Sequence, residues 1–318
     1  MIFSHNFDFD PACGYSEEEL LKIKQPTDTP ADFSSFWRDT YKEALVPPTK
    51  ITKRRIWSPS EAIEAWELFF DSWEGVRIGA WIARPLAGSK GGIVLGHGYG
   101  THIFGDMSWA EKGFTCISLC IRGFSLSAHE TIPWSVKSHV LHRIESRDQY
   151  VLRGAVADIW RAASAMLELY PDTSANLCYC GSSFGGGLGA LSIPWDPRFR
   201  AAYWDVPTFG HHSLRMKFKS HGSGEAVRLY AQEHPEVSEV LRYYDAASSA
   251  GQTRIPVICS VALFDPTVVP PGQFAVANAL PQPPCCRIIV PGGHYGYPEH
   301  KGIYEGIAAK VLTLFEKC

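Results

Sequence analysis

A series of short apolar runs, which begins at Gly91, constrains the fold of this 318-residue chain more than any other feature. Each run ends in glycine or in polar, turn-forming residues. Continuous apolar runs of this kind are typical of parallel strands that are buried on both faces of a sheet. The runs are GGIVLGHGYG, FTCISLCIRG, NLCYCGSS, FRAAYWDVP, RIPVICSVALFD and CRIIVPGGH.

Two further stretches have the apolar spacing of helices. In residues 150–170 and in the C-terminal segment, apolar side chains recur about every 3.6 residues. These side chains are Val151, Ala155, Ile159, Ala162, Met166 and Leu169 in the first stretch, and Ile303, Ile307, Val311 and Phe315 in the second. Strands that alternate with helices predict a mostly parallel, doubly wound α/β sheet, in a single domain over residues 1–318.

Several segments lie outside this alternation. Residues 1–60 predict an N-terminal arm with one helix at DFSSFWRDTYKEAL. Apolar runs on either side of residues 73–75 predict a strand pair closed by a tight turn. Residues 126–148 fit neither pattern, and residues 207–250 are long enough to form a small helical cap. Ligands in such sheets bind at the carboxyl ends of the strands, where these loops emerge.

The composition excludes several classes of function. The formal net charge is −3, without a long run of one sign, so we expect no nucleic-acid partner. No apolar run is long enough to span a membrane, and the N-terminal residues lack the pattern of a secretory signal, so we expect a cytoplasmic protein. No pair of CxxC motifs exists, and no third ligand accompanies His211 and His212. We therefore expect no metal and a solvated histidine pair on the cap.

A glycine-rich stretch, YCGSSFGGGLG, carries the pattern G-x-S-x-G at Gly181-Ser182-Ser183-Phe184-Gly185. This pattern predicts a sharp strand-to-helix turn that exposes Ser183 as a nucleophile. Two alternatives remain open. The stretch can be an ordinary tight turn, or Gly185 to Ala190 with Asp205 can be the fingerprint of a dinucleotide-binding oxidoreductase.

The rest of the chain favours the nucleophile. A catalytic serine needs a histidine base and an acid that orients it, and in α/β hydrolases these follow in the order serine, acid, histidine. Asp265 ends one later apolar run, and His294 lies in the turn after the next. We expect the backbone N–H groups of Tyr99 and Phe184 to bind the developing oxyanion. His97 is expected to be a turn histidine bonded to the backbone.

With these motifs, the chain resembles the acetyl xylan esterase and cephalosporin C deacetylase family, carbohydrate esterase family seven. The resemblance rests on TPADFSSFW, HGYG, CIRGFS, YVLRGAVADIWRAAS, GSSFGGGLG, ALFDPTVVPPGQFAVAN and VPGGHYG. It implies an α/β-hydrolase fold with Ser183, Asp265 and His294 as the triad and Tyr99 as an oxyanion donor. It also implies hydrolysis of acetylated small sugars inside the cell, without metal or cofactor, by a homo-oligomer that is commonly a hexamer.

Three residues depart from the family pattern. Phe184 and Phe124 stand where the family usually has glutamine, and Tyr295 stands where glutamate is common. These changes predict an apolar substrate pocket, lined by Phe124 and Phe209. A carboxylesterase for hydrophobic or aromatic esters, and a serine acyltransferase or peptidase with the same residues, therefore remain alternatives.

Overall fold

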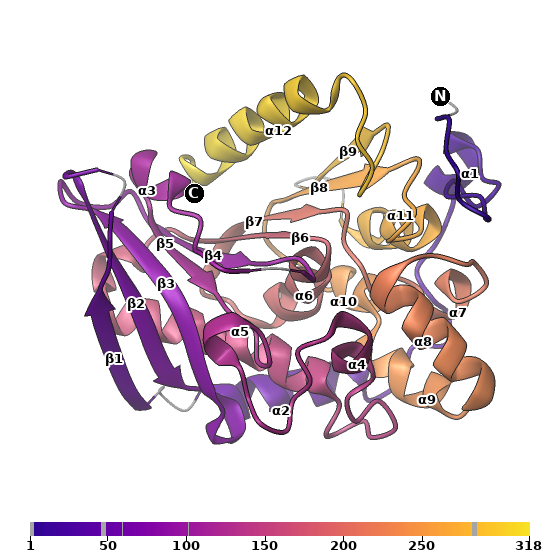
Figure 1. Ribbon diagram of the computed structural model, residues 1–318, viewed down its shortest axis with the longest axis horizontal. Coiled ribbons are helices and arrows are strands. Elements are labelled where there is room, and N and C mark those ends of the chain that lie inside the picture. Colours follow the sequence, from indigo (N-terminus) through magenta and orange to yellow (C-terminus); the bar gives the residue numbers. More distant parts are fainter. Residues whose placement is uncertain (1–2, 46–48, 59, 101, 282–284) are drawn as a thin grey trace.

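One mixed sheet organises the computed structural model, which describes residues 3–45, 49–58, 60–100, 102–281 and 285–318 (Figure 1). Over these residues, nine strands pair in the order β1-β2-β3-β5-β4-β6-β7-β8-β9. They are β1 (Thr49–Arg55), β2 (Ile63–Asp71), β3 (Arg77–Pro85), β4 (Gly92–Gly96), β5 (Thr115–Leu119), β6 (Leu177–Ser182), β7 (Phe199–Asp205), β8 (Val257–Ala262) and β9 (Cys286–Val290). The pairs between β1, β2, β3 and β5 are antiparallel, and those from β5 to β9 are parallel. The six predicted runs are the six strands of the parallel part.

Alternate residues of the parallel strands are buried on opposite faces of the sheet. Val94 and Tyr179 belong to one hydrophobic core, whereas Ile93 and Cys178 belong to another. Helices α5 and α6 cover the first face, and α3 and α12 cover the second, as Figure 1 shows. Burial on both faces explains why these strands have continuous apolar sequences.

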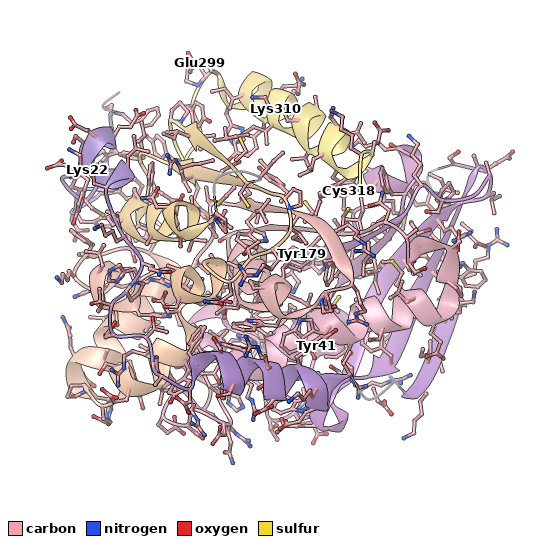
Figure 2. All side chains as sticks on the ribbon, turned by 180° about the vertical axis from the view of Figure 1, so that it is seen from behind. Lys22, Tyr41, Tyr179, Glu299, Lys310 and Cys318 are labelled. Atoms are coloured by element: carbon pink, nitrogen blue, oxygen red, sulfur yellow. The ribbon has the colours of Figure 1, made fainter. Side chains whose placement is uncertain are left out.

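The predicted helices form with small changes in their bounds. The helices are α1 (Glu17–Leu21), α2 (Phe33–Ala44), α3 (Ser108–Glu111), α4 (Val136–Leu141), α5 (Val151–Leu169), α6 (Phe184–Ser192), α7 (His212–Arg215), α8 (Gly222–Glu233), α9 (Val237–Leu241), α10 (Ala246–Ala250), α11 (Pro270–Ala279) and α12 (His300–Phe315). Figure 2 shows the molecule from behind, with Tyr41 of helix α2 labelled. The Tyr41 hydroxyl donates a hydrogen bond of 2.9 Å to Asp196 Oδ1 and so connects α2 to the residues before β7. Within the described part of the chain, no helix has the length and apolar character needed to cross a bilayer.

The segments outside the alternation differ in part from expectation. The strand pair is confirmed as β2 and β3, with a short turn at Trp73–Gly75 between them. The segment 1–60, expected as an arm, contributes strand β1 to the edge of the sheet. Its sequence, TKITKRR, is rich in basic residues, which suit an exposed edge strand but obscure the strand pattern.

The segment 207–250, expected to form a small helical cap, contains the α-helices α7, α8, α9 and α10. Helices α7, α8 and α9 lie together at one end of the molecule (Figure 1). Helix α8 packs against α4 from the segment 126–148, so the two irregular segments are in contact. Helix α10, in contrast, packs against α6 and α11 and belongs to the layer of helices that covers the sheet.

Candidate active site

Ser183 occupies a sharp turn between strand β6 and helix α6. Its backbone has φ 56° and ψ −110°, a conformation that is strained for a residue with a side chain. Glycine is required two residues before and two residues after Ser183, because a side chain at either position would clash with the backbone. A Cβ on Gly185 would lie 2.2 Å from the carbonyl oxygen of Gly96, and one on Gly181 would lie 2.6 Å from the backbone of Gly185. The G-x-S-x-G sequence therefore allows the close approach of β4, β6 and α6 that this turn needs.

The structure brings Ser183, His294 and Asp265 into one hydrogen-bonded chain. His294 Nε2 lies 2.9 Å from Ser183 Oγ, and His294 Nδ1 lies 2.8 Å from Asp265 Oδ2. Because an ionised carboxylate only accepts hydrogen bonds, Nδ1 carries the proton of a neutral His294 and Nε2 is free to accept one from Ser183. This is the arrangement in which a serine hydroxyl can be deprotonated during attack.

Asp265 is fully buried in the loop after β8. Its Oδ1 accepts hydrogen bonds from the backbone N–H groups of Thr267 and Val268, at 2.8 and 2.9 Å. Its Oδ2 accepts a third, at 2.9 Å, from the side-chain amide of Gln273 on α11. Gln273 is a functional candidate that the sequence reasoning missed. Its signal in the sequence was an amide side chain among the mostly apolar residues of α11.

The same groups determine the basicity of His294. Burial by itself lowers the pKa of this imidazole, but the hydrogen bond to Asp265 and the negative charge of Asp265 outweigh burial. The pKa of His294 is therefore raised above its ordinary value. The side chain remains 25% exposed, so protons can exchange with solvent.

Two predicted oxyanion donors lie in segments next to Ser183. Phe184 is the first residue of α6, where a backbone N–H has no preceding helical carbonyl to bind. The loop after β4 also reaches the serine, because a Cβ on Gly98 would lie 3.8 Å from that of Ser183. The Tyr99 ring stacks on the Phe184 ring, with centroids 3.8 Å apart. The two residues are thus held together by their side chains.

His97 is bonded to the backbone, as predicted. Its Nδ1 lies 2.8 Å from the carbonyl of Gly98, and its Nε2 accepts a hydrogen bond of 3.1 Å from the N–H of Ile121. Burial lowers the pKa of His97 to about 4. A neutral histidine therefore fixes the shape of this loop.

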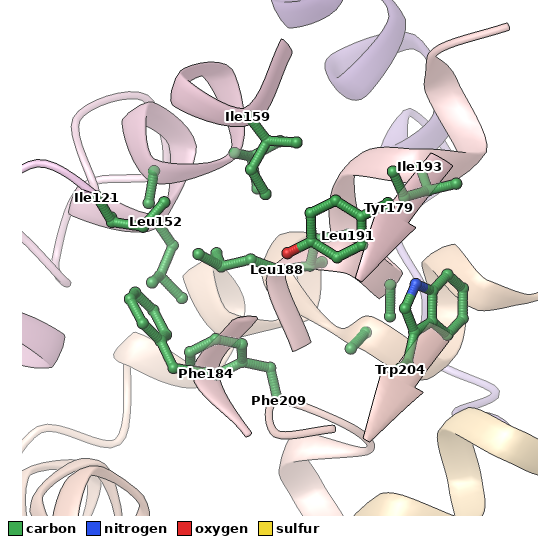
Figure 3. Packing of buried hydrophobic residues seen from close by; sticks show 14 of the residues in the cluster. Ile121, Leu152, Ile159, Tyr179, Phe184, Leu188, Leu191, Ile193, Trp204 and Phe209 are labelled. Atoms are coloured by element: carbon green, nitrogen blue, oxygen red, sulfur yellow. The ribbon is translucent and has the colours of Figure 1, made fainter. Parts of the chain in front are cut away.

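The two expected pocket residues have different surroundings. Phe124 lines a mainly apolar pocket of about 430 Å³ together with His102, Ile103 and Trp134. Phe209 is only 2% exposed, and its ring packs edge-on against Phe184 at 6.0 Å, as Figure 3 shows. Phe209 thus packs behind the nucleophile turn rather than in the open pocket, because its left-handed backbone (φ 67°) turns the chain just after β7.

The features that suggested a dinucleotide or a solvated histidine pair have other roles. Gly185 to Ala190 lie inside helix α6 rather than in a loop before it. Asp205 accepts a hydrogen bond of 2.8 Å from Ser182 and is buried, so it is not free to bind a ribose. His212 is also buried, contrary to expectation, because its Nε2 bonds to the carbonyl of Tyr244. No group of three metal-ligating side chains occurs among the described residues.

Several known proteins are similar to this chain. A family model described as acetyl xylan esterase (AXE1) matches residues 13–305. The acetyl esterase Axe7A of Xylanibacter ruminicola is 22% identical over 283 residues; the match covers 85% of this chain but only 64% of that relative's length.

Solved structures give the same family of relatives. An acetyl xylan esterase from a Paenibacillus species has a TM-score of 0.82, and acetyl xylan esterase 1 from a Thermoanaerobacterium species has one of 0.80. Each is 20% identical, and the matches cover 93% and 94% of this chain and 99% of each of those chains. The predicted α/β-hydrolase fold is confirmed.

Proposed function

Because the chain belongs to the acetyl xylan esterase family, we propose that it is a serine esterase that removes acetyl groups from small acetylated sugars or similar short-chain esters. The observation that carries this proposal is the hydrogen-bonded chain from Ser183 through His294 to Asp265. The strained turn and the adjacent N–H groups supply the remaining parts of an acyl-transfer site.

The first half of the proposed reaction forms an acyl-enzyme. Ser183 Oγ attacks the ester carbonyl carbon while His294 Nε2 takes its proton. Asp265 holds the imidazole in the required tautomer and stabilises the imidazolium that forms. The backbone N–H groups of Tyr99 and Phe184 bind the oxyanion of the tetrahedral intermediate, and loss of one such donor typically costs about 100-fold or more in rate. The alcohol then leaves with the proton from His294.

The second half releases the acid. Water gives a proton to His294 as it attacks the acyl carbon, and the second tetrahedral intermediate collapses to free Ser183 and the carboxylic acid. No step requires a metal ion or an organic cofactor. In this proposal the protein itself supplies the base, the nucleophile and the oxyanion donors.

A second candidate substrate class is a more hydrophobic or aromatic ester. The pocket beside Phe124 favours it, because Trp134 and Ile103 at its rim are 78% and 79% exposed. An apolar acyl or alcohol group that covers these side chains would remove much of their surface from water. Sugar rings also pack on exposed indoles, so the pocket is compatible with both classes.

We also propose that residues 1–318 form one domain, that the protein acts in the cytoplasm, and that it assembles as a homo-oligomer, a hexamer by family resemblance. The nine strands over the described residues form one sheet, which supports the first point. All nine cysteines are free thiols, which are typical of a reducing compartment. Light scattering after size exclusion measures the assembly directly.

The test is hydrolysis of a nitrophenyl ester series, from acetyl to octanoyl and benzoyl, by the wild type and Ser183→Ala. We expect Ser183→Ala to lose about 1,000-fold or more of the activity. The adjacent Ser182→Ala is the matched control and should keep most of it. Acetyl preference supports a deacetylase, and preference for longer or aromatic acyl groups supports the hydrophobic candidate. Full activity in Ser183→Ala rules out the mechanism.

A further inference from the structure

Arg215 in the cap is a buried cation whose guanidinium is hydrogen-bonded to no described residue. It ends helix α7, and its residue surface is only 8% exposed. Within the described part of the chain, its guanidinium makes no hydrogen bond and no ion pair. The guanidinium carbon Cζ instead lies over the Phe209 ring, 5.9 Å from the ring centroid, in a cation–π contact. A buried arginine normally pairs with a carboxylate, because an unpaired buried charge is costly.

The neighbouring carboxylates are already used. Asp245 interacts with Arg215 electrostatically, but its oxygens accept hydrogen bonds from the backbone N–H groups of His212, Ala247 and Ser248. Glu225 on α8 forms an ion pair of 2.7 Å with Arg228. Burial lowers the pKa of Arg215 to about 10. Arg215 therefore remains protonated at neutral pH, with unused N–H donors.

The position of Arg215 connects it to the candidate active site. Phe209, which it contacts, packs against Phe184, the residue after the nucleophile (Figure 3). Arg215 also interacts electrostatically with the hydroxyls of Tyr99 and Tyr150. Arg215 is thus connected through the Phe209 ring to the residue after the nucleophile, and it lies near the hydroxyl of Tyr99.

The cap leaves room for this guanidinium. A Cβ on Gly224, at the start of α8, would lie 2.6 Å from Arg215 Nη2. Any other residue at this position would displace the side chain. Arg228 offers a contrast within the same helix layer, because its charge is already neutralised by Glu225. Of these two arginines, Arg228 is therefore paired with a carboxylate of the protein, whereas Arg215 has space beside its guanidinium and no paired carboxylate among the described residues.

We propose that Arg215 binds a carboxylate of the substrate, so that this esterase prefers esters that carry an anionic group several bonds from the reacting carbonyl. The inference rests on the proposed esterase function and specifies its substrate class. A guanidinium and a carboxylate form paired, charge-assisted hydrogen bonds, which would satisfy the donors that the protein leaves unused. The carboxylate can belong to the acyl part or to the alcohol part of the ester.

Two pairs of esters distinguish these sources. The acyl-side pair is the para-nitrophenyl monoester of glutaric acid and its primary amide. The alcohol-side pair is para-acetoxybenzoate and para-acetoxybenzamide. We expect the wild type to have a higher kcat/KM for the anionic member of at least one pair. Arg215→Met should reduce this preference about tenfold or more, as for a lost hydrogen bond to a charged group. Arg228→Met is the matched control and should keep the preference.

The outcomes separate the two proposals. Equal rates within both pairs for the wild type, or an unchanged preference in Arg215→Met, overturn the inference while leaving the esterase function intact. The wild-type rates decide this even if Arg215→Met does not fold. If no ester of either pair or of the nitrophenyl series is hydrolysed, the esterase function fails and the inference fails with it.

Discussion

Two buried aspartates lie at the same edge of the sheet, on neighbouring strands, and they are bound in different ways. Among the described residues, the carboxylate of Asp265, after β8, accepts hydrogen bonds only from N–H groups, those of Thr267, Val268, Gln273 and His294. The carboxyl group of Asp205, at the end of β7, accepts hydrogen bonds within the described structure only from hydroxyls, those of Ser182, Tyr203 and Tyr304. The edge of the sheet therefore provides two carboxyl sites with different chemistry.

The kind of donor decides which protonation state is favoured. Backbone and amide N–H groups can only donate, so they stabilise a carboxylate and not a carboxylic acid. Hydroxyls can donate or accept, and they suit either state. Burial raises the pKa of Asp205. The comparison teaches that the donors around Asp265 suit only a carboxylate, whereas the hydroxyls around Asp205 suit either protonation state.

The largest effect is expected from Asp265→Asn. An asparagine amide can present an N–H to His294 and reverse the tautomer, so kcat should fall by about 10,000-fold while the fold is retained. The remaining activity should also lose its acid limb at the raised pKa of His294, because the charge that raises this pKa is removed. Activity normally falls as the pH drops through that pKa, since protonated His294 cannot act as a base. A pH profile of kcat/KM for both proteins measures this. An unchanged profile would contradict the role given to Asp265.

The next effect is expected from Gly293→Ala. A Cβ on Gly293 would lie 2.4 Å from Asp265 Oδ2, so the carboxylate or the turn that carries His294 must shift, and the hydrogen bond between them is disturbed. A displacement of this size typically costs about 100-fold in rate. Gly296→Ala in the same loop is the control, because a Cβ there meets no atom within 4 Å. Equal kcat values for the two variants would show that the position of Asp265 is not critical.

Gln273→Leu should have a smaller effect on rate and a measurable effect on stability. The change removes a donor to Asp265 and an acceptor of the backbone N–H of Ala262, at 2.8 Å. Leaving buried groups unpaired costs about 1–3 kcal/mol of unfolding free energy, and kcat should fall about tenfold. Denaturant unfolding and the pH profile together test this. Asn278→Leu on the same helix loses hydrogen bonds to the backbone carbonyls of Leu20 and Ile23 and one from Arg287, but none to Asp265, so it should lower stability without moving the acid limb.

Much of the sheet and of the site could be predicted from the sequence, because strand-end position is a property of the local sequence. Continuous apolar runs identified β4 to β9, and the residues just after them identified Ser183, Asp265 and His294 as neighbours. The spacing of G-x-S-x-G also carries steric information, since only glycine fits beside Gly96. These features depend on the backbone and not on where side chains point.

The surroundings of the site could not be predicted, because they depend on side-chain direction and tertiary packing. Gln273 reaches Asp265 from another helix, and its spacing in the sequence does not reveal this. His212 can be buried because its Nε2 bonds to the backbone carbonyl of Tyr244, and the polar residues around His212 in the sequence do not reveal this. Phe209 turns inward at a positive φ that no local pattern required. Strand β1 has a basic sequence and becomes a strand by pairing with β2.

The smallest effect, and the sharpest test of the comparison, is expected from Asp205→Asn. The charge of Asp205 contributes to the raised pKa of His294, but it does so from a distance and without a hydrogen bond. Removing it should lower the pKa of His294 and shift the acid limb of kcat/KM to lower pH by less than about one unit, with kcat changed less than about tenfold. Asp172→Asn, which removes a charge paired with Arg84 before β6, is the control and should not shift the limb. A loss as large as that of Asp265→Asn would mean that the two carboxylates share the role of orienting His294. The N–H and hydroxyl environments would then not be functionally distinct.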